Sequence, residues 1–464
     1  MLPPPVALIV YLAGIIWIFR MNRDKMPASP ALWIPVAWIA IAASRTVTEW
    51  FGGVSGLRSP DQYLDGSPLD AAIFAALEIA AVMVLVSRHP RTGQFLRANG
   101  PLIVFFAYCL VSVMWSDFPL TAAKRWTKAV GNLLMVLVVF TDPAGPTVAV
   151  RRFLARVGFV LIPLSILFIK YFPELGRGFS QWTGAGYNAG VAYDKNGLGI
   201  ICLIFGLGTL WRFVVLLERP ERPRPRRMLV ANGVIVLMTL YLLRMADSAT
   251  SLGCFAVGAA MIVLTGRRKF SLPVPAVHIV AVLILVGCLF ALLVDTDVGL
   301  VQAMGRDPTL TTRTQLWEDV LKMPVNPLFG AGFESFWLGD RAKTLWRKHW
   351  WHPNQAHNGY IEIYLNLGWL GLIALALVIV WGYRNVILAL DSDRTLGRLR
   401  LGFFLAALLY NFTEAAFKAI HPVWIAFMMA VVLVPEPKQV VQHQQVFHPR
   451  RMRTASPSPS ARRV

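Results

Sequence analysis

Long apolar stretches alternate with short polar or basic segments along the 464 residues of this chain. A helix that crosses a hydrocarbon core of about 30 Å needs about 20 mostly apolar residues, so such stretches predict membrane-spanning helices. Several are shorter than that, and two neighbours can form one kinked or re-entrant element. The pattern predicts an all-α, polytopic transmembrane helical protein with about 12 to 13 spans. The candidate spans are residues 5–19, 30–44, 69–87, 101–115, 128–141, 157–172, 197–217, 229–245, 250–265, 274–294, 358–382, 401–417 and 422–434.

Basic residues concentrate in alternate connecting segments. These segments read RMNRDK, RHPRTGQFLR, RRFLAR, ERPERPRPRR, GRRK and DSDRTLGRLR, and their parity agrees from end to end. Short loops rich in Lys and Arg stay on the cytoplasmic side of a membrane. This orientation leaves one large loop on the outer side at about 295–357, together with shorter outer loops at 45–70, 116–127 and 173–196.

Composition supports this assignment and explains the charge of the chain. Hydrophobic residues make up 56% of the sequence, charged residues only 15%, and the mean hydropathy is +0.55. The net charge of +20 comes largely from the cytoplasmic loops and from a basic, Pro/Ser-rich tail. We expect an integral membrane domain over 1–434, followed by a disordered cytoplasmic tail at 435–464. No basic aromatic nucleic-acid module is present, so we expect no nucleic-acid partner.

An ionisable side chain opens the apolar run AHNGYIEIYLNLGWLG. At 3.6 residues per turn, His357, Tyr360, Tyr364, Gly368 and Gly371 would lie on one face of a helix. A partly desolvated histidine at the outer end of that face suits a proton acceptor that works near neutral pH. Geometry alone also allows an interfacial histidine that only caps the helix, because polar and aromatic belts are common at membrane surfaces.

The motifs of this chain resemble those of a known family. His357-Asn358, nine residues and then Gly368-Trp369-Leu370-Gly371 resemble the H-N-x9-G-x-x-G signature of the O-antigen ligase and polysaccharide polymerase superfamily of bacterial membrane glycosyltransferases. The segment ALWIPVAWIAIAASRTVTEW is similar to the branch that includes exopolysaccharide-production polymerases of the rhizobial type. Other family motifs resemble, in chain order, WSDFPLTAAKRW (115–126), DKNGLG (194–199), TTRTQLW (311–317), NPLFGAGFESF (326–336) and NFTEAAF (411–417).

This resemblance implies an activity and a set of partners. The implied enzyme is a metal-independent glycosyltransferase that moves a glycan from undecaprenyl diphosphate to a sugar hydroxyl at the periplasmic face. The implied acceptor is a glycan or a lipid A-core-type molecule, and membrane lipid and polysaccharide assembly or export proteins are further partners. Whether the chain is a ligase or a polymerase depends on the acceptor, which the sequence leaves open.

The reaction needs a base and fixed cations. Withdrawal of the acceptor's proton is worth about 10² to 10⁴ in rate, and arginine donates paired hydrogen bonds to the oxygens of a departing diphosphate. We expect His357 as the general base and Arg313 as the principal cation. The candidate substrate-binding residues are Asn358, Lys195, Arg125 and Tyr360.

Several features qualify these assignments. Asp194 stands where a basic residue is expected before Lys-Asn, so Lys195 is the more credible participant in that segment. The outer carboxylates are scattered apart from Asp295 and Asp297, and we expect no metal, no cofactor and no nucleotide-sugar donor. Glu78 and Glu414 lie in or near predicted spans, where ionisable residues are usually functional, but the sequence identifies no partner for either.

Two other classes of protein compete with the enzyme. A flippase or transporter for lipid-linked oligosaccharides would also have many spans and cationic sites, but such proteins usually show internal repeats and a site near the membrane midplane. No repeat is evident, and the motif residues are predicted to lie at one face. A noncatalytic scaffold of a polysaccharide-export assembly would tolerate loss of His357 and Arg313.

Overall fold

The computed structural model describes residues 2–22, 28–52, 67–218, 226–266, 274–293 and 309–435. Contacts divide the chain into Met1–Val434 and Pro435–Val464. Residues 294–308 of the predicted large loop and residues 436–464 of the tail lie outside the described residues, so the disorder of the tail and its cytoplasmic location stay predictions.

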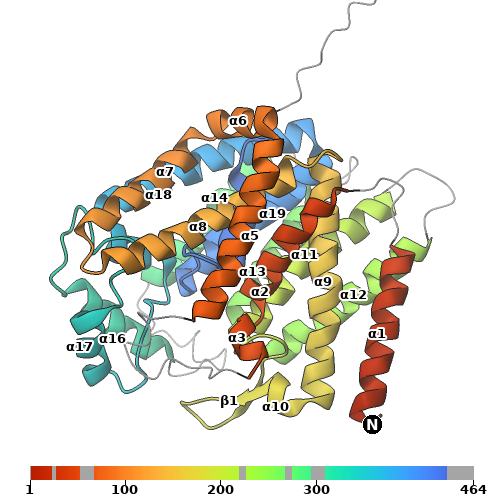
Figure 1. Cartoon of the computed structure of the whole chain (residues 1–464), viewed down its shortest axis with the longest axis horizontal. Helices are drawn as coiled ribbons and strands as arrows, with labels where there is room; N and C mark the ends of the chain where they lie inside the picture. The colour runs from red at the N-terminus through yellow and green to blue at the C-terminus, as the bar shows by residue number, and fades with distance from the viewer. Residues whose placement is uncertain are drawn as a thin grey trace, which may run out of the picture. The chain divides into compact units, whose positions relative to one another are not determined.

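The described chain is almost entirely helical (Figure 1), which confirms the predicted all-α class. Its two strands, β1 (Arg177–Phe179) and β2 (Gly186–Asn188), form one small antiparallel hairpin. Two 3-10 helices, η1 (Pro30–Leu32) and η2 (Ser112–Trp115), adjoin α2 and α7. The α-helices are α1 (Pro4–Met21), α2 (Trp33–Ala43), α3 (Val47–Trp50), α5 (Pro68–Ser87), α6 (His89–Ala98), α7 (Gly100–Val111), α8 (Pro119–Phe140), α9 (Pro146–Tyr171), α10 (Pro173–Gly176), α11 (Lys195–Glu218), α12 (Arg226–Ala246), α13 (Ala249–Leu264), α14 (Val274–Leu293), α16 (Thr309–Leu321), α17 (Gly339–Lys348), α18 (Gly359–Ser392), α19 (Arg394–Thr413) and α20 (Pro422–Val431).

Each predicted apolar stretch coincides with a described helix, but not every helix is long enough to cross a membrane alone. Among the described residues, six helices meet the length and apolarity of a span, namely α1, α5, α9, α11, α12 and α18. Helix α6 and the segment from α7 to η2 are bent by 86° and give a seventh if they count as one span. The predicted 12 to 13 spans therefore exceed the helices that are individually long and apolar enough. Among the others, α2 with η1, α13 and α20 are apolar but shorter.

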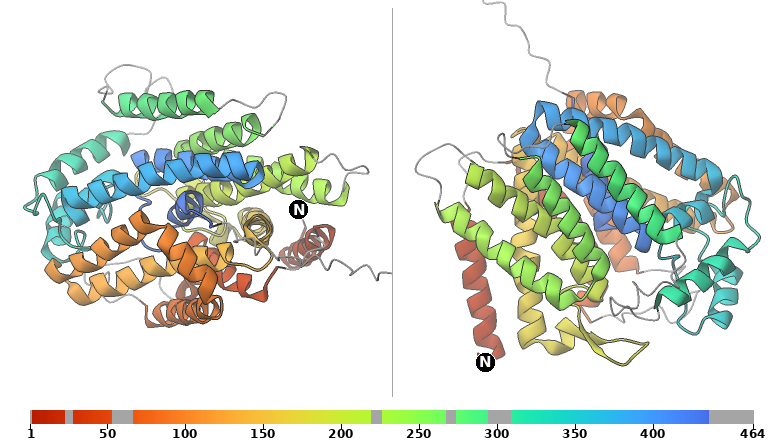
Figure 2. Two further views of the ribbon diagram at one scale, coloured as in Figure 1. Left: turned by 90° about the horizontal axis from the view of Figure 1, so that it is seen from above. Right: turned by 180° about the vertical axis from the view of Figure 1, so that it is seen from behind.

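Helices α11 and α19 form the interior of the bundle, and α1 and α5 lie at its periphery (Figure 2). An apolar helix that is covered on all sides belongs in the core, and nearly every residue of α19 is buried. The buried Arg400 of α19 donates from Nε to the carbonyl of Ala430 at 2.8 Å. This bond satisfies a carbonyl near the end of α20 that would otherwise lack a helical partner.

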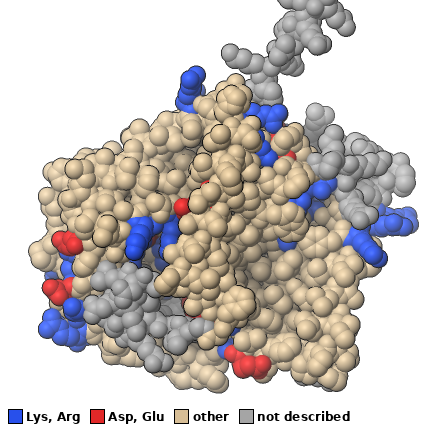
Figure 3. All heavy atoms as spheres, viewed as in Figure 1, with Lys and Arg blue, Asp and Glu red and all other residues tan. Residues whose placement is uncertain are grey.

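The helices bring the alternate connections together at two opposite ends of the bundle. At one end Arg88 pairs with Asp142, and Arg398 with Glu218. The connections that meet there adjoin the basic segments, as the parity of the sequence predicted. The other end carries α3, α10, the hairpin, α16 and α17 (Figure 1). The broad face in Figure 3 shows few charged side chains between these ends, as expected of a surface that contacts lipid.

Candidate active site

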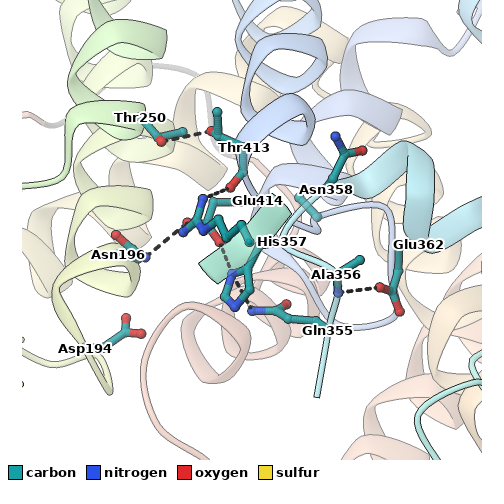
Figure 4. Close-up of polar contacts among 12 residues, drawn as sticks. Asp194, Asn196, Thr250, Gln355, Ala356, His357, Asn358, Glu362, Thr413 and Glu414 are labelled. Atoms are coloured by element: carbon teal, nitrogen blue, oxygen red, sulfur yellow. Dashed lines mark hydrogen bonds and ion pairs between the residues drawn. The ribbon is translucent and has the colours of Figure 1, made fainter. Parts of the chain in front are cut away.

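One carboxylate joins the two residues predicted to be catalytic. Oε2 of Glu414 lies 3.0 Å from Nδ1 of His357, and Oε1 lies 3.0 Å from Nη2 of Arg313. Figure 4 shows Glu414 extending from the end of α19 toward the imidazole. His357 follows α17, Arg313 belongs to α16 and Glu414 follows the last residue of α19. We call these three side chains the Glu414 cluster. Folding therefore assembles at one place residues that are about 100 positions apart, as in Arg313 and Glu414.

Neighbouring polar groups hold this carboxylate in place. The amide of Asn196, at the start of α11, donates to Oε1 of Glu414 at 3.2 Å, and Ser248 donates to Oδ1 of Asn196 at 3.2 Å. Arg313 also donates from Nη1 to the carbonyl of Thr413 at 2.6 Å. Glu414 thus receives charge-assisted and neutral hydrogen bonds at once, the usual way in which a protein retains a buried charge.

These partners keep Glu414 ionised. Burial alone would raise the pKa of the Glu414 carboxyl, but the hydrogen bond from His357 and the positive charges beside it hold that pKa below its ordinary value. An ionised carboxylate only accepts hydrogen bonds, so Nδ1 of His357 must donate. The neutral imidazole then has its lone pair on Nε2, and that nitrogen is the atom able to accept a proton.

The backbone before α18 holds His357 in a strained conformation. His357 has a φ of 51°, in the left-handed region that side chains with a Cβ seldom adopt. The preceding residue is fixed on both sides: Trp317 donates to the carbonyl of Ala356 at 2.6 Å, and the amide of Ala356 donates to Glu362 at 2.9 Å. Such strain persists only where the surroundings determine it, and it is concentrated at functional sites.

The structure corrects the predicted position of His357. The histidine precedes the helix, because α18 begins at Gly359 and Asn358 is its N-cap. Oδ1 of Asn358 accepts from the amides of Tyr360 and Ile361 at 3.0 and 3.1 Å, and its Nδ2 donates to the carbonyl of Phe412. Both ends of the Asn358 side-chain amide are therefore hydrogen-bonded to the backbone. Its predicted role in sugar binding stays a prediction.

The Tyr360 side chain packs against α19 and the residues that follow it. Its hydroxyl donates to the carbonyl of Leu408 at 3.2 Å, and its ring packs near Phe412 and Phe417. These contacts favour packing between α18 and α19. Its predicted contact with substrate stays a prediction.

The predicted continuous face of α18 is also wrong, because the helix breaks at Gly368. This residue has φ 64° and ψ −163°, a conformation essentially restricted to glycine. The break frees the next two amides, and Trp369 and Leu370 donate to the carbonyls of Pro327 and Leu328 at 2.9 and 3.2 Å. A Cβ on Gly368 would lie 2.3 Å from the backbone of Leu328. The G-x-x-G half of the signature thus forms backbone hydrogen bonds with the Gly-rich turn that begins at Asn326.

Arg125 attaches this same turn to α8. Its Nη1 donates to the backbone carbonyl of Glu334, and the Glu334 carboxylate accepts from the amide of Ala419 at 2.6 Å. The contacts described here place Arg125 against the Gly-rich turn, and they do not join it directly to Glu414. Its predicted contact with phosphate stays a prediction.

The segment DKNGLG lies at the start of α11, beside Glu414. Oδ1 of Asp194 accepts from the amide of Gly197 at 2.7 Å. This bond caps the helix, for which aspartate is a preferred residue, and it gives a structural reason for an acid at this position. Within the described residues the half-buried Lys195 side chain makes no hydrogen bond or ion pair, whereas its neighbour Asn196 contacts Glu414.

Sequence reasoning missed four members of the site. Glu414 was noticeable only as a carboxylate near a span, and its partners were not predictable because they lie far away in the sequence. Asn196 gave no signal beyond its place in the Lys-Asn motif. Nε2 of Gln355 lies 3.5 Å from Nδ1 of His357, and its Oε1 accepts from Nζ of Lys418 at 2.8 Å. Neither Gln355 nor Lys418 belongs to a recognisable pattern.

Other predicted features contribute less to the site. Among the described residues no group of three or more His, Cys, Asp or Glu side chains is placed to hold a metal ion. The expectation of a metal-independent reaction stays a prediction. Glu78 of α5 takes no part in the Glu414 cluster, and its Oε1 is buried without a hydrogen-bond partner among the described atoms.

Comparison with known proteins places the site within a family region. The O-antigen ligase family model matches residues 233–376, which include Arg313 and His357. The exopolysaccharide production protein ExoQ of Rhizobium meliloti (strain 1021) is 25% identical over 309 residues, covering 63% of this chain and 67% of that protein. A Rickettsia conorii (strain Malish 7) protein, named provisionally a polysaccharide ligase, is 23% identical over 308 residues, covering 64% and 70%. The resemblance expected from the motifs is therefore confirmed: residues 233–376 match the O-antigen ligase family model.

Proposed function

We propose that this protein is a membrane glycosyltransferase of surface polysaccharide assembly. It transfers a glycan from undecaprenyl diphosphate to a sugar hydroxyl at the periplasmic face of the bacterial inner membrane. The observation that carries the proposal is the shared contact of His357 and Arg313 with Glu414. The family match and the names of the similar proteins support polysaccharide assembly as the process.

In the proposed reaction, Nε2 of His357 takes the proton of the acceptor hydroxyl. The acceptor oxygen forms a bond to the anomeric carbon of the donor, and the bond from that carbon to the diphosphate oxygen breaks. The diphosphate leaves with the bonding electrons, and Arg313 stabilises the charge that develops on it. Glu414 positions the imidazole by accepting from Nδ1, the role of the carboxylate in other base–carboxylate pairs.

The charge of the site explains why a second cation is needed. Glu414 offsets part of the positive charge of Arg313, because the two form an ion pair at 3.0 Å. A diphosphate carries more charge than one such arginine can balance. Lys418 is a further candidate, since its Nζ bonds to Gln355 and Gln355 lies beside His357. We therefore assign Lys418 to the diphosphate, together with Arg313.

The position of the site favours chemistry over transport. The Glu414 cluster lies at the end of the bundle away from the basic connections, beside α16 and the end of α19. A transporter would instead place its site near the midplane, between internal repeats. The location supports transfer between a donor held in the membrane and an acceptor that arrives from the aqueous side.

The proposal is tested in a strain that lacks the gene and is complemented with wild type, His357→Ala or Arg313→Ala. We expect normal membrane insertion for all three proteins and loss of the mature polysaccharide with both variants. Normal polysaccharide with the variants would support a scaffold and contradict an enzyme. Transfer by purified wild-type protein in nanodiscs, with lipid-linked donor and acceptor, should be unchanged by EDTA.

The same strain separates ligase from polymerase. Gel analysis of its glycans should show single repeat units on their usual acceptor if the protein is a polymerase. Polymer that accumulates on the lipid carrier would indicate a ligase. Glycans identical to those of wild type would contradict both assignments.

A further inference from the structure

Three tryptophans from two distant segments meet next to the Glu414 cluster. Trp182 lies in the turn between β1 and β2, and Trp350 and Trp351 follow α17. The Trp182 ring centroid is 4.8 Å from that of Trp350 and 5.6 Å from that of Trp351. The Trp351 centroid is 6.2 Å from that of His357. The cluster therefore extends from the protein surface to the proposed base.

Packing within the protein does not account for the open ring of Trp350. Trp350 remains 62% exposed although it contacts Trp182. A tryptophan gains most when its large ring is covered, and an open aromatic surface next to a candidate active site is characteristic of a ligand site. Trp182 and Trp351 are only partly buried, so none of the three rings is fully covered.

The segment that carries Trp350 and Trp351 is held firmly. His349 donates from Nε2 to Asp319 at 2.9 Å, and Lys348 also pairs with Asp319. Burial would raise the pKa of Asp319, but these two partners keep it below its ordinary value, so the carboxylate stays charged. Asp319 belongs to α16, the helix that also carries Arg313. The segment that carries Trp350 and Trp351 is thus fixed to the helix that carries the proposed phosphate-binding arginine.

We propose that Trp182, Trp350 and Trp351 form a saccharide-binding platform that holds the acceptor glycan with its reacting hydroxyl directed at His357. This inference rests on the proposed function and names the place where the acceptor binds. One face of a sugar ring is rich in C–H groups and packs on an indole, while its hydroxyls remain hydrated at the edge. The distance from Trp351 to His357 allows one sugar ring to touch both side chains.

The acceptor is a better occupant than the donor or the bilayer. The donor is attached to a lipid and approaches from the membrane, whereas the platform is formed by a hairpin and a loop outside the long helices. An interfacial anchor would point its rings outward into lipid. Here the rings contact one another and lead inward to His357.

Kinetics with purified protein in nanodiscs test the platform. Trp350→Ala and Trp182→Ala should each raise the KM for acceptor about 3- to 10-fold, the range of aromatic contact energies. The kcat at saturating acceptor and the KM for donor should change little. Trp350→Phe should retain part of the affinity. Unchanged acceptor KM in both alanine variants would overturn the platform.

Two control variants separate the platform from a membrane anchor. Phe179→Ala removes an aromatic ring that is 80% exposed on the same hairpin, and Trp17→Ala removes an exposed tryptophan of α1. Both should leave the acceptor KM unchanged. If Phe179→Ala has the same effect as Trp182→Ala, the hairpin anchors the protein in the membrane and the proposal is wrong.

A binding measurement separates this inference from the proposed function. Saturation-transfer NMR is performed on His357→Ala protein with the oligosaccharide repeat unit of the host's surface polysaccharide. We expect binding that Trp350→Ala abolishes in the same background. Binding of this kind without transfer by the wild-type protein would contradict the enzyme and leave the platform intact. Transfer without a Trp350-dependent signal would contradict the platform alone.

Discussion

Nδ1 of His357 lies 3.0 Å from Oε2 of Glu414, although 57 positions separate the two residues in the sequence. The same carboxylate contacts Arg313 through its other oxygen. A group that orients the proposed base and also holds the proposed cation couples the two halves of the reaction. Displacement of Glu414 should therefore disturb proton transfer and leaving-group stabilisation together.

Glu414→Gln should remove this coupling while keeping the size of the side chain. A neutral amide can accept from only one of the two partners, and its NH₂ group faces a donor at the other. We expect kcat to fall about 10- to 100-fold, the range for residues that orient a functional histidine, with smaller changes in KM. Glu318→Gln on the exposed surface of α16 should have no effect.

The tautomer of His357 gives a direct readout of that role. Nitrogen NMR of protein labelled at histidine should show His357 protonated at Nδ1 in the wild type. In Glu414→Gln both neutral tautomers should be populated. An unaltered His357 spectrum in an inactive but folded Glu414→Gln protein would mean that Glu414 acts in some other way.

Arg313→Lys should impair the enzyme although lysine keeps the positive charge. A lysine cannot donate the paired, planar hydrogen bonds that arginine offers to phosphate oxygens and to Glu414. We expect Arg313→Ala to lower kcat about 10² to 10³-fold and Arg313→Lys to fall between alanine and wild type. Lys322→Ala is the matched control, because Lys322 directly follows α16 and forms an exposed pair with Glu318. Such pairs contribute about 0 to 1 kcal/mol, so equal loss in this control would contradict a specific role for Arg313.

Gly368→Ala should destabilise the protein by more than about 1 to 3 kcal/mol. The backbone conformation alone accounts for that amount, and the added Cβ would lie 2.3 Å from Leu328. Gly253→Ala in α13 is the control, since nothing lies within 4 Å of a Cβ there and alanine favours a helix by about 1 kcal/mol. Thermal unfolding in detergent measures both. Equal melting temperatures for Gly368→Ala and wild type would show that the helix is not broken at this residue.

The contribution of Glu414 to stability should depend on pH. Its pKa is lowered from the ordinary 4.5 in the folded protein. A depressed carboxyl pKa stabilises the folded state fully above the unfolded value, and this stabilisation is lost as the pH falls through the folded value. At about pH 5, above both the folded and the unfolded pKa of Glu414, the melting temperature of wild type should exceed that of Glu414→Gln. The difference should shrink in more acidic solution, and a difference that grows there would contradict the ion pair.

The sequence predicted the helices and the grouping of the motif residues, and the physical reasons are clear. Apolar runs report burial in lipid or protein, and the parity of basic loops reports which connections share an end of the bundle. These two signals were sufficient to place His357 and Arg313 at the same end. The family motifs then singled out both residues as candidates for the chemistry.

The local geometry of the site could not be predicted in the same way. Periodicity treats His357 to Gly371 as one helix, whereas tertiary contacts hold His357 before the helix and break the helix at Gly368. The loop that accepts the amides freed at Gly368 begins at Asn326, far from the apolar run. The role proposed for Glu414 likewise depends on His357 and Arg313, which lie on other segments.

The most direct test of the account is the transfer rate of His357→Gln protein, measured with lipid-linked donor and saturating acceptor in nanodiscs. Glutamine preserves size and polarity but cannot take up a proton at neutral pH. We predict a fall in kcat of about 10² to 10⁴-fold, with acceptor binding and melting temperature close to wild type. A His357→Gln enzyme that turns over at the wild-type rate would contradict His357 as the base.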